Sequence, residues 1–434
     1  MPMAALAAWM VGKTIVPLNY LLKPEELRFV ISDCETDTVI TAGPMLEFVG
    51  HRPDVSNIVE LDKLSFRGFP EPRWPAAADP EDLAILLYTS GTSGRPKGVM
   101  LTHANIAANI QQCLEWVRFS RDEVLVGVLP QFHTFGITAL TLLPLTRGCK
   151  TVYTARFNPQ KIVKLIREHN ATAIIAIPSM YNALMHVKSA TAEDFASLRY
   201  IVSGGEPLPQ AVFDAFFKRF DRKINEGYGL TETSPVTNWC RPEEWRPHSV
   251  GRPLPWIDER IVDLNTRVPL GPGQDGEVII KGPNVMRGYF KRPDETAAVF
   301  DADGFFKTGD IGRFDEDGHL YITGRLKEMI IVGGENVFPR EIEEVINMHP
   351  AVGASGVIGV MDPMRGELPV AFVELKEGQQ ADGRSILVWC RDKLAGYKLP
   401  QNVYVVPQLP RNPTGKIMRR ELKKLLPSSE SSGP

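Results

Sequence analysis

Short apolar runs alternate with amphipathic stretches along the first half of the chain. Apolar runs bounded by turn residues are typical of buried strands, and apolar positions three or four apart are typical of helices. Strands are therefore predicted at 36–42, 83–90, 123–130, 171–178 and 198–205, and helices at 107–117, 160–169 and 211–220. Strands that alternate with helices predict an α/β fold, with mixed α/β elements and layered sheets covered by helices.

The pattern changes near residue 250, where glycine and proline punctuate short strands at 276–282, 304–312 and 318–324. Short strands separated by turn residues predict a small β-rich subdomain. A further α/β unit follows, with helices expected at 339–350, 385–395 and 417–426 and strands at 355–360 and 369–375. We expect a large N-terminal domain over 1–323, a hinge over 324–328, a smaller C-terminal domain over 329–426 and a disordered polar tail over 427–434.

The first residues are apolar enough to suggest a signal peptide. They lack a positively charged start, and Lys13 interrupts them before a credible cleavage site. A core helix over 4–12 followed by a short strand over 14–17 is the better interpretation. No apolar segment reaches the length that a membrane span requires.

The composition and charge of the chain limit the kinds of binding partner that are expected. The chain has 434 residues, 43% of them hydrophobic and 23% charged, which is ordinary for a soluble globular protein of two or three domains. Its net charge of −3 gives no electrostatic reason to expect nucleic acid or an anionic membrane as partner. The five cysteines are scattered and lack metal-binding spacing, which indicates reduced thiols in a cytosolic protein.

A loop rich in glycine and hydroxyl groups follows the strand predicted at 83–90. Backbone N–H groups freed by glycine can close around an anion, while hydroxyls and a lysine add donors and positive charge. We therefore predict a polyphosphate-binding loop, although a flexible surface turn is the alternative. It is not a Walker A loop, because no Ser or Thr follows its lysine. The candidate ligands are Thr89, Ser90, Gly91, Thr92, Ser93, Gly94 and Lys97.

Two further clusters follow predicted strands. Residues 203–209 place two glycines between a strand and a helix start, where a planar ring can lie against bare backbone; a simple tight turn is equally consistent. Residues 225–233 are predicted as one loop that places Tyr228 to stack on a base, Thr231 to bind a phosphate and Glu232 to ligate magnesium. An exposed polar loop is the alternative, and it would leave Tyr228 unexplained.

The last two clusters carry a carboxylate and basic residues. Asp310 follows a glycine, and a carboxylate with Arg325 nearby suits recognition of ribose hydroxyls. Taken singly, both residues are more often parts of a surface turn and a salt bridge. Lys416 closes a compact turn before a basic helix; most such lysines are solvated surface charges.

Taken together and in order, these five clusters resemble the adenylate-forming superfamily of acyl-CoA synthetases, peptide-synthetase adenylation domains and luciferases. Residues 88–98 are similar to its phosphate loop, 227–232 to its adenine and magnesium motif, and 308–310 to its ribose carboxylate. Residues 324–343 are similar to its hinge motif, and 412–416 to its mobile-lysine motif. The resemblance covers nearly the whole chain and implies a mobile C-terminal domain.

The resemblance also implies a role for each residue. The loop at 88–98 would hold the β- and γ-phosphates of ATP, with Thr92 and Glu232 on Mg²⁺. Thr231 would bind the α-phosphate, Asp310 and Arg325 the ribose, and Lys416 would bridge the carboxylate and the α-phosphate. Lys327 would be the hinge, and His133 would lie beside the acyl group. The adenine would be framed by Gly204, Gly205, Glu206, Tyr228 and Gly229, and the pantetheine arm of coenzyme A admitted by Gly333 and Gly334.

Within the superfamily, the acyl-CoA synthetase branch fits best. Residues 132–136 contain no Asp to hold a substrate ammonium, as amino-acid-activating domains have, and Ile331 stands where luciferase-like enzymes have a lysine. Coenzyme A ligation of a medium- or long-chain fatty acid is thus expected. Candidates for lining the acyl pocket are His133, Phe135, Met180, Tyr181, Ser203 and Pro235.

Several alternatives stay open at this point. An aryl carboxylate is an alternative acyl donor to the fatty acid, and a carrier-protein thiol is an alternative acceptor to coenzyme A. Compared with the resembling family, the chain is expected to begin inside the first subdomain, so a shortened, inactive nucleotide- or acyl-binding protein is a further hypothesis. A cytoplasmic location is expected, and the resemblance leaves open peripheral membrane contact and a monomeric or homodimeric state.

Overall fold

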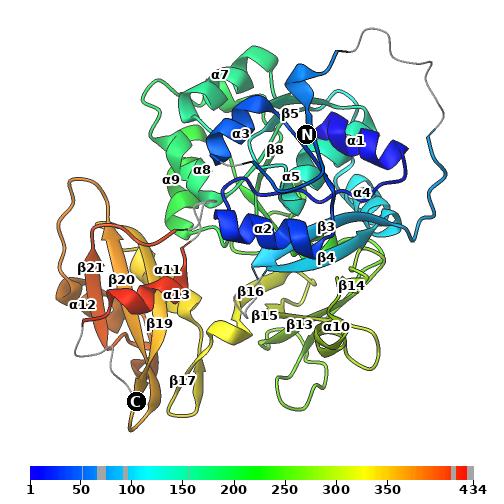
Figure 1. Cartoon of the computed structure of the whole chain (residues 1–434). Coiled ribbons are helices and arrows are strands. Elements are labelled where there is room, and N and C mark those ends of the chain that lie inside the picture. The colour runs from blue at the N-terminus through cyan, green and yellow to red at the C-terminus, as the bar shows by residue number, and fades with distance from the viewer. Residues whose placement is uncertain (51, 66–74, 91–95, 155, 412–416, 428–434) are drawn as a thin grey trace.

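The computed structural model describes residues 1–434 except 51, 66–74, 91–95, 155, 412–416 and 428–434. Figure 1 shows the C-terminal elements, coloured orange and red, to one side of the rest of the chain. The yellow segment between them carries β16 (Leu320–Arg325) and β17 (Ile330–Val332). The mixed α/β class predicted from the sequence is confirmed.

The largest sheet has seven strands, in the order β11-β10-β9-β8-β7-β5-β6. Neighbouring strands from β6 to β9 run parallel, and β10 and β11 close the edge in antiparallel fashion. Every residue of β7 is buried, because helices cover the faces of a parallel sheet. The strands are β5 (Val124–Gly127), β6 (Lys150–Tyr153), β7 (Ala173–Ala176), β8 (Tyr200–Ser203), β9 (Asn225–Gly229), β10 (Val236–Trp239) and β11 (Arg252–Pro253).

The helices around this sheet form where apolar positions recur at helical spacing. In α7, the buried residues Ile162, Val163 and Ile166 lie on one side, and the Asn158 side chain caps the first turn by accepting from the Lys161 N–H. The same group contains α4 (His103–Val117), α5 (Thr134–Ile137), a π-helical turn (Thr138–Leu142), α6 (Leu143–Arg147), α7 (Pro159–His169), α8 (Pro178–Met185) and α9 (Gln210–Phe220).

A three-stranded and a four-stranded sheet also belong to the larger part of the chain. A three-stranded sheet in the order β14-β4-β3 places the start and end of the phosphate loop on adjacent strands. A four-stranded antiparallel sheet has the order β12-β13-β15-β16 and fulfils the β-rich subdomain predicted beyond residue 250. The strands are β3 (Leu83–Ser90), β4 (Pro96–Thr102), β12 (Asp258–Val262), β13 (Gly276–Lys281), β14 (Gly288–Tyr289) and β15 (Phe306–Phe314), and helix α10 (Pro293–Val299) follows β14.

The N-terminal segment contributes three helices and a two-stranded parallel sheet. Tyr88, at the end of β3, donates a hydrogen bond of 2.6 Å to Asp33 at the end of α2, which ties this segment to the phosphate loop. Its elements are α1 (Pro2–Met10), α2 (Pro24–Asp33), β1 (Thr38–Thr41), α3 (Gly43–Val49) and β2 (Asn57–Glu60). Among the described residues, no helix has the length and apolar character needed to cross a membrane.

The C-terminal part has its own sheet and core. Its strands follow the order β18-β17-β20-β19, and β21 pairs with β20. Arg419 joins the ends of this part, with a bond of 2.6 Å to Glu343 and one of 2.5 Å to Glu328. The elements are β18 (Glu335–Val337), α11 (Pro339–Asn347), β19 (Val352–Asp362), β20 (Gly366–Leu375), α12 (Gly383–Arg391), β21 (Asn402–Val406) and α13 (Arg419–Leu422).

Three local predictions are wrong. Residues 14–17 form no strand; Ile15 makes a single bridge to Ile85. Residues 225–229 are not loop but strand β9, because pairing with β8 and β10 outweighs the weak strand preference of glycine. The basic helix expected over 417–426 is a short helix, α13, followed by a 3₁₀ turn. The tail at 428–434 lies outside the described residues.

Candidate functional site

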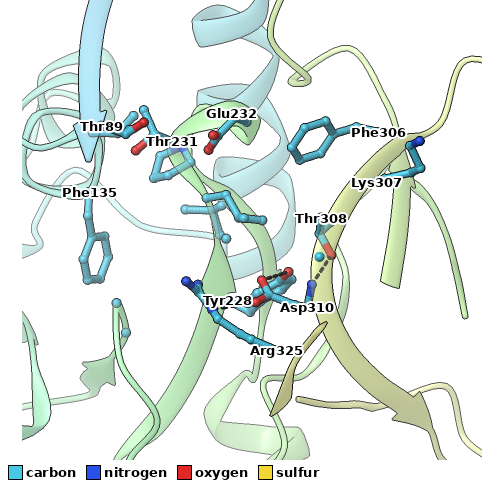
Figure 2. A pocket seen from close by; sticks show the side chains of 18 of the residues that line it. Thr89, Phe135, Tyr228, Thr231, Glu232, Phe306, Lys307, Thr308, Asp310 and Arg325 are labelled. Carbon is cyan, nitrogen blue, oxygen red and sulfur yellow. Dashed lines mark hydrogen bonds and ion pairs between the residues drawn. The ribbon is translucent and has the colours of Figure 1, made fainter. Parts of the chain in front are cut away.

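A cavity of about 850 Å³ opens where β8 and β9 meet the four-stranded sheet. It lies beyond the carboxyl end of β8, the place where open α/β sheets bind ligands. Figure 2 shows Thr89, Thr231 and Glu232 at one part of this pocket, and Tyr228, Asp310 and Arg325 at another. The cavity therefore joins elements from three sheets.

Asp310 is held in place by two neighbours. It is 2% exposed, accepts a 2.7 Å hydrogen bond from the Tyr228 hydroxyl, and pairs with Arg325 Nε at 2.8 Å. The pairing of β15 with β16 sets Asp310 directly opposite Arg325. Burial, and then the nearby Asp310 charge, hold the pKa of Tyr228 well above its usual value, so the phenol stays a donor. The carboxylate keeps acceptor capacity for ligand hydroxyls.

A second network surrounds Glu232. Its carboxylate accepts a 3.0 Å hydrogen bond from the Tyr289 hydroxyl, and burial raises the pKa of Glu232. Lys97 on β4 lies 5.3 Å from the centre of the Tyr289 ring and forms an ion pair with Glu295 of α10. Glu232, Tyr289 and Lys97 all line the cavity. A cation, a phenol and a carboxylate are thus grouped at the end of the cavity nearest the phosphate loop.

These groups fit a divalent cation that arrives with a polyphosphate. Among the described residues, no three His, Cys, Asp or Glu side chains form a cluster able to hold a metal ion by themselves. Mg²⁺ is commonly bound by one or two carboxylates together with phosphate oxygens and water. Glu232 can supply such a carboxylate. Thr92, the other predicted metal ligand, lies outside the described residues.

Glycines shape the middle of the cavity. A Cβ atom added at Gly204 would lie 3.0 Å from the Phe135 ring, and one at Gly229 would lie 1.8 Å from the Pro235 carbonyl oxygen. Gly205 has φ of +79°, a left-handed conformation that favours glycine. Gly204 and Gly229 therefore allow the backbone to pack closely against Phe135 and Pro235. That a flat ring lies against the backbone at 203–209 stays a prediction.

The structure brings most of the predicted site residues together. The following all line the one cavity: Thr89, Lys97, His133, Gly204, Gly205, Tyr228, Gly229, Thr231, Glu232, Asp310, Arg325 and Lys327. Glu206 is not among the lining residues, and Gly333 and Gly334 lie away from it at the turn between β17 and β18. The placements of Gly91, Thr92, Ser93, Gly94 and Lys416, and of the Ser90 side chain, lie outside the described residues.

The predicted acyl pocket is only half right. His133, Phe135 and Pro235 line the cavity, whereas Met180, Tyr181 and Ser203 do not. Tyr181 is fully buried in the core, where its hydroxyl donates to the Val202 carbonyl at 2.7 Å. This large aromatic residue after a strand therefore belongs to the buried core and not to the wall of the pocket.

Tyr289 and Trp239 are among the residues that line the cavity and that sequence reasoning missed. Tyr289 reaches Glu232 because β14 pairs with β4, a long-range contact that no local pattern reveals. Trp239 ends strand β10, and a register shift after Val236 decides which way it faces. Only the proximity of Trp239 to the cluster at 225–233 was a signal in the sequence.

A buried acid lies under Tyr228. Asn238 donates a 2.8 Å hydrogen bond to Glu259 Oε2, and Thr237 donates to Asn238 and to the Tyr228 carbonyl. Glu259 Oε1 is buried without a hydrogen-bond partner among the described residues. Burial raises the pKa of Glu259 to about 8. The folded protein therefore holds this proton more tightly than the unfolded chain does.

Replacement of Glu259 by glutamine should make folding less dependent on pH. Because the pKa is raised on folding, its contribution is fully present below the unfolded value and is lost as pH rises through about 8. Glutamine keeps the acceptor for Asn238 and carries no titrating proton. The variant should melt several degrees above wild type at about pH 9 and close to it at about pH 4, as measured by calorimetry. Asp258→Asn, at an exposed position, is the control; an equal shift in both variants would contradict the assignment.

Comparisons with known proteins place this cavity in context. A family model described as AMP-binding enzyme matches residues 1–290, and one described as AMP-binding enzyme C-terminal domain matches 341–416. A long-chain-fatty-acid–CoA ligase of Bacillus subtilis (strain 168) is 41% identical over 351 residues, 79% of this chain and 62% of that protein. The matched segment thus spans less than two thirds of that relative. A feruloyl-CoA synthase of Amycolatopsis sp is 34% identical over 95% of this chain and 84% of its own length.

Among solved structures, ATP-bound MatB from Rhodopseudomonas palustris matches with a TM-score of 0.90 at 33% identity, over 98% of this chain and 86% of that chain. The apo form of the same protein matches this chain with a TM-score of 0.79, at the same identity and coverage. Since the sequences compared are the same, the difference is one of conformation. The arrangement of this chain is closer to the ATP-bound form.

Proposed function

The chain belongs to the AMP-binding enzyme family, and we propose that it is an ATP-dependent carboxylate:CoA ligase. In the first half-reaction a carboxylate oxygen attacks the α-phosphorus of ATP, giving an acyl adenylate and pyrophosphate. In the second, the thiol of coenzyme A attacks the acyl carbon, AMP leaves and the thiol proton is released. The single observation that carries this proposal is the cavity in which Asp310, Glu232 and Lys97 converge.

The two ends of the cavity would bind different parts of the nucleotide. Asp310, with Tyr228 and Arg325, offers acceptor oxygens for the ribose hydroxyls. The backbone at Gly204 and Gly205 would lie against the adenine. At the other end, phosphate oxygens compete with Glu295 for Lys97, and Thr231 lies where it can donate to the α-phosphate.

Charge is the main obstacle to the first half-reaction, since both reactants are anions. A Mg²⁺ ion on Glu232 would offset negative charge on the phosphates. Lys97 and Lys416 would add positive charge beside the phosphates, and donors fixed at a developing charge can each be worth about 10²–10³ in rate. The protein therefore contributes mainly position and electrostatics.

The second half-reaction requires a different set of contacts. A lysine that bridges the carboxylate and the α-phosphate would block the approach that the thiol needs, so we propose that the C-terminal part turns about Lys327, withdraws Lys416 and brings Gly333 and Gly334 to the cavity. Two observations support this. Lys327 lines the cavity while Gly333 and Gly334 do not, and a Cβ atom added at either glycine would have no neighbour within 4 Å, which leaves room for a pantetheine chain.

The experiment that tests this function is an acid panel. The full chain is supplied with Mg-ATP and each of acetate, octanoate, palmitate, benzoate and ferulate, and AMP release is measured with and without coenzyme A. The fatty acid expected from the sequence and a ferulate-type aryl acid are both candidate substrates. At least one acid should give AMP that depends on coenzyme A; formation of ADP, or no nucleotide cleavage with any acid, would refute the proposal.

Tyr289→Phe should weaken the response to magnesium. Loss of the hydroxyl removes a donor from Glu232 Oε1, and a hydrogen bond of this kind is worth about 0.5–1.5 kcal/mol. The Mg²⁺ concentration for half-maximal AMP release should rise about three- to tenfold, and calorimetry should show weaker Mg²⁺-dependent ATP binding. Tyr321→Phe, outside the cavity, is the control. An unchanged Mg²⁺ titration in Tyr289→Phe would show that the hydroxyl does not position Glu232.

Lys327→Pro should block the second half-reaction and spare the first. Proline fixes φ and would stiffen the segment about which the C-terminal part turns. Thioester formation from supplied acyl adenylate should fall at least about tenfold, while adenylate formation stays near wild type. Stopped assays of each half-reaction measure both rates. A thioester rate that is unchanged in this variant would rule out rotation at residue 327.

A further inference from the structure

We propose that Arg340 holds the C-terminal part of the chain in the orientation that forms the acyl adenylate, by donating a hydrogen bond to the Ile322 carbonyl on the other side of the proposed hinge. This contact would have to break before the C-terminal part can turn and the thiol of coenzyme A can react. The inference rests on the proposed function and assigns a positioning residue to it. Arg340 is not one of the described residues that line the cavity.

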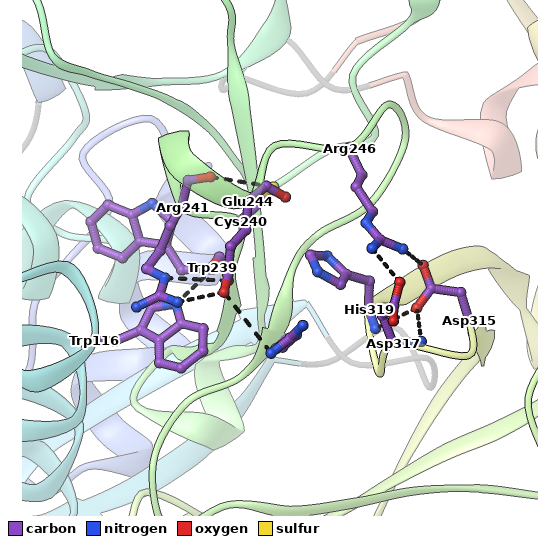
Figure 3. Close-up of polar contacts among 10 residues, drawn as sticks. Trp116, Trp239, Cys240, Arg241, Glu244, Arg246, Asp315, Asp317 and His319 are labelled. Carbon is purple, nitrogen blue, oxygen red and sulfur yellow. Dashed lines mark hydrogen bonds and ion pairs between the residues drawn. The ribbon is translucent and has the colours of Figure 1, made fainter.

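The strand that accepts this hydrogen bond is fixed to the larger part of the chain. Ile322 lies on β16, the edge strand of the four-stranded sheet, and an edge strand leaves backbone groups on one side without a partner strand. Figure 3 shows how the turn before β16 is attached: Arg246, from the loop after β10, pairs with Asp315 at 2.6 Å and with Asp317 at 2.5 Å. The Ile322 carbonyl is therefore an acceptor that stays with the larger part.

The donor belongs to the C-terminal part. Arg340 lies in the first turn of α11, and its Nε donates a 2.9 Å hydrogen bond to Glu344 one turn further along that helix. Ile342 of α11 and Val332 of β17 are buried in the same core, so α11 and β17 form one unit. A turn that brings residues 333–334, directly after β17, to the cavity would therefore carry Arg340 with it and away from β16.

A second contact joins the same strand to the same end of α11. A Cβ atom added at Gly324 of β16 would lie 2.6 Å from Phe338 Cδ1, so the Phe338 ring lies directly against the bare backbone of the strand. Phe338 immediately precedes α11, and Arg340 is its second residue. The ring contact and the hydrogen bond are thus neighbours, and a turn of the C-terminal part would disturb both.

Charges also interact between the two parts. Glu226 of β9 is 8% exposed and accepts a 3.3 Å hydrogen bond from the Leu208 N–H. Burial raises the pKa of Glu226 to about 7; the charge of Arg340 opposes this rise, and the charge of Glu344 adds to it. Arg340 therefore lies close enough to a buried carboxylate of the larger part for their charges to attract, which further favours the present orientation.

The expected effect follows from the two orientations. In the present one, Lys327 lines the cavity and residues 333–334 do not, which is the arrangement that the proposed mechanism assigns to adenylate formation. Loss of a contact made only in this orientation lowers its population. Arg340→Ala should therefore slow adenylate formation and leave thioester formation from supplied acyl adenylate as fast as in wild type or faster, the opposite of the effect expected for Lys327→Pro.

The ratio of the adenylate-forming rate to the thioester-forming rate should fall about tenfold or more in Arg340→Ala, because a hydrogen bond from a charged donor is lost in only one orientation. Arg340→Lys keeps the charge and a donor and should recover part of the ratio. Gly324→Ala, whose added methyl would displace Phe338, should lower the ratio with Arg340 intact. Arg391→Ala removes an exposed arginine from α12 and is the matched control, with the wild-type ratio expected.

The orientation itself is measured without turnover, as the distance between spin labels at two exposed positions, Phe217 of α9 and Met364 of the β19–β20 turn. Wild type should give one main distance, and Arg340→Ala and Gly324→Ala should each add a second population. If that population appears while no acid of the panel gives AMP, the proposed function fails and the role of Arg340 holds. The inference is overturned if Arg340→Ala slows both half-reactions by the same factor, or if it keeps the wild-type distances.

Discussion

Replacement of Lys416 by alanine is expected to lower the rate of acyl-adenylate formation by about 10²–10³, the effect of removing one fixed donor from a developing charge. Thioester formation from supplied acyl adenylate should stay near wild type, because the proposed mechanism withdraws Lys416 in that step. No other single change should separate the two half-reactions so strongly in this direction.

The residues around Lys416 support this role. Arg411 and Ile417, which flank 412–416, form a bridge, and Arg411 pairs with Glu374 at 2.7 Å. On the other side, Arg419 binds Glu328, directly after Lys327, the proposed hinge. The segment that carries Lys416 is thus fastened at both ends to the C-terminal part, so a turn at residue 327 would move Lys416 with it.

The two half-reactions are measured separately, by pyrophosphate release without coenzyme A and by thioester formation from synthetic acyl adenylate. Lys424→Ala is the matched control, since this exposed lysine pairs with Glu421 on the same helical segment. Lys416→Ala would contradict the assigned role if both rates fell by the same factor, or if neither changed.

Asp310→Asn is expected to lower kcat/KM for ATP by about 10² or more. Asparagine has the same shape but offers only one acceptor, and it leaves the Arg325 guanidinium without its counter-charge. Truncating one partner of a hydrogen-bonded, buried charge pair typically costs about 2–5 kcal/mol. The loss should appear mainly as a raised KM for ATP, because the ribose contact is made in the ground state as well as in the transition state.

Steady-state kinetics and ATP titration by calorimetry measure this change, and a melting curve shows whether the variant remains folded. Asp317→Asn removes a carboxylate that is exposed and paired with Arg246, well outside the cavity, and should leave ATP binding unchanged. An Asp310→Asn protein that is folded and binds ATP as wild type does would remove the ribose assignment.

Most parts of the site that were predictable from sequence lie at or near strand ends, and Asp310 lies within β15. The runs at 83–90 and 198–205 were recognisable as strands, so the loops after them were expected at the ligand-binding edge. Asp310 and Arg325 were expected together, and the pairing of β15 with β16 brings them into contact. Where a motif and a strand end coincide, local sequence is a sufficient guide.

The parts that were not predictable depend on long-range pairing. Tyr289 reaches Glu232 only through the pairing of β14 with β4. The direction of Trp239 depends on a register shift in β10, and a shift of one residue turns a side chain to the opposite face. Half of the predicted acyl-pocket residues were also misplaced, since Met180, Tyr181 and Ser203 do not line the cavity. The order of residues along the chain does not show how deep a pocket is or which side chains reach it.

The most informative single measurement is carboxylate-dependent exchange of labelled pyrophosphate into ATP by the full chain, without coenzyme A. Exchange occurs only if a carboxylate reversibly takes up AMP from ATP in this cavity. We expect exchange that requires Mg²⁺ and an acid and that falls by about 10²–10³ in Lys416→Ala. A protein that binds ATP but shows no exchange with any acid of the panel would contradict the proposed mechanism.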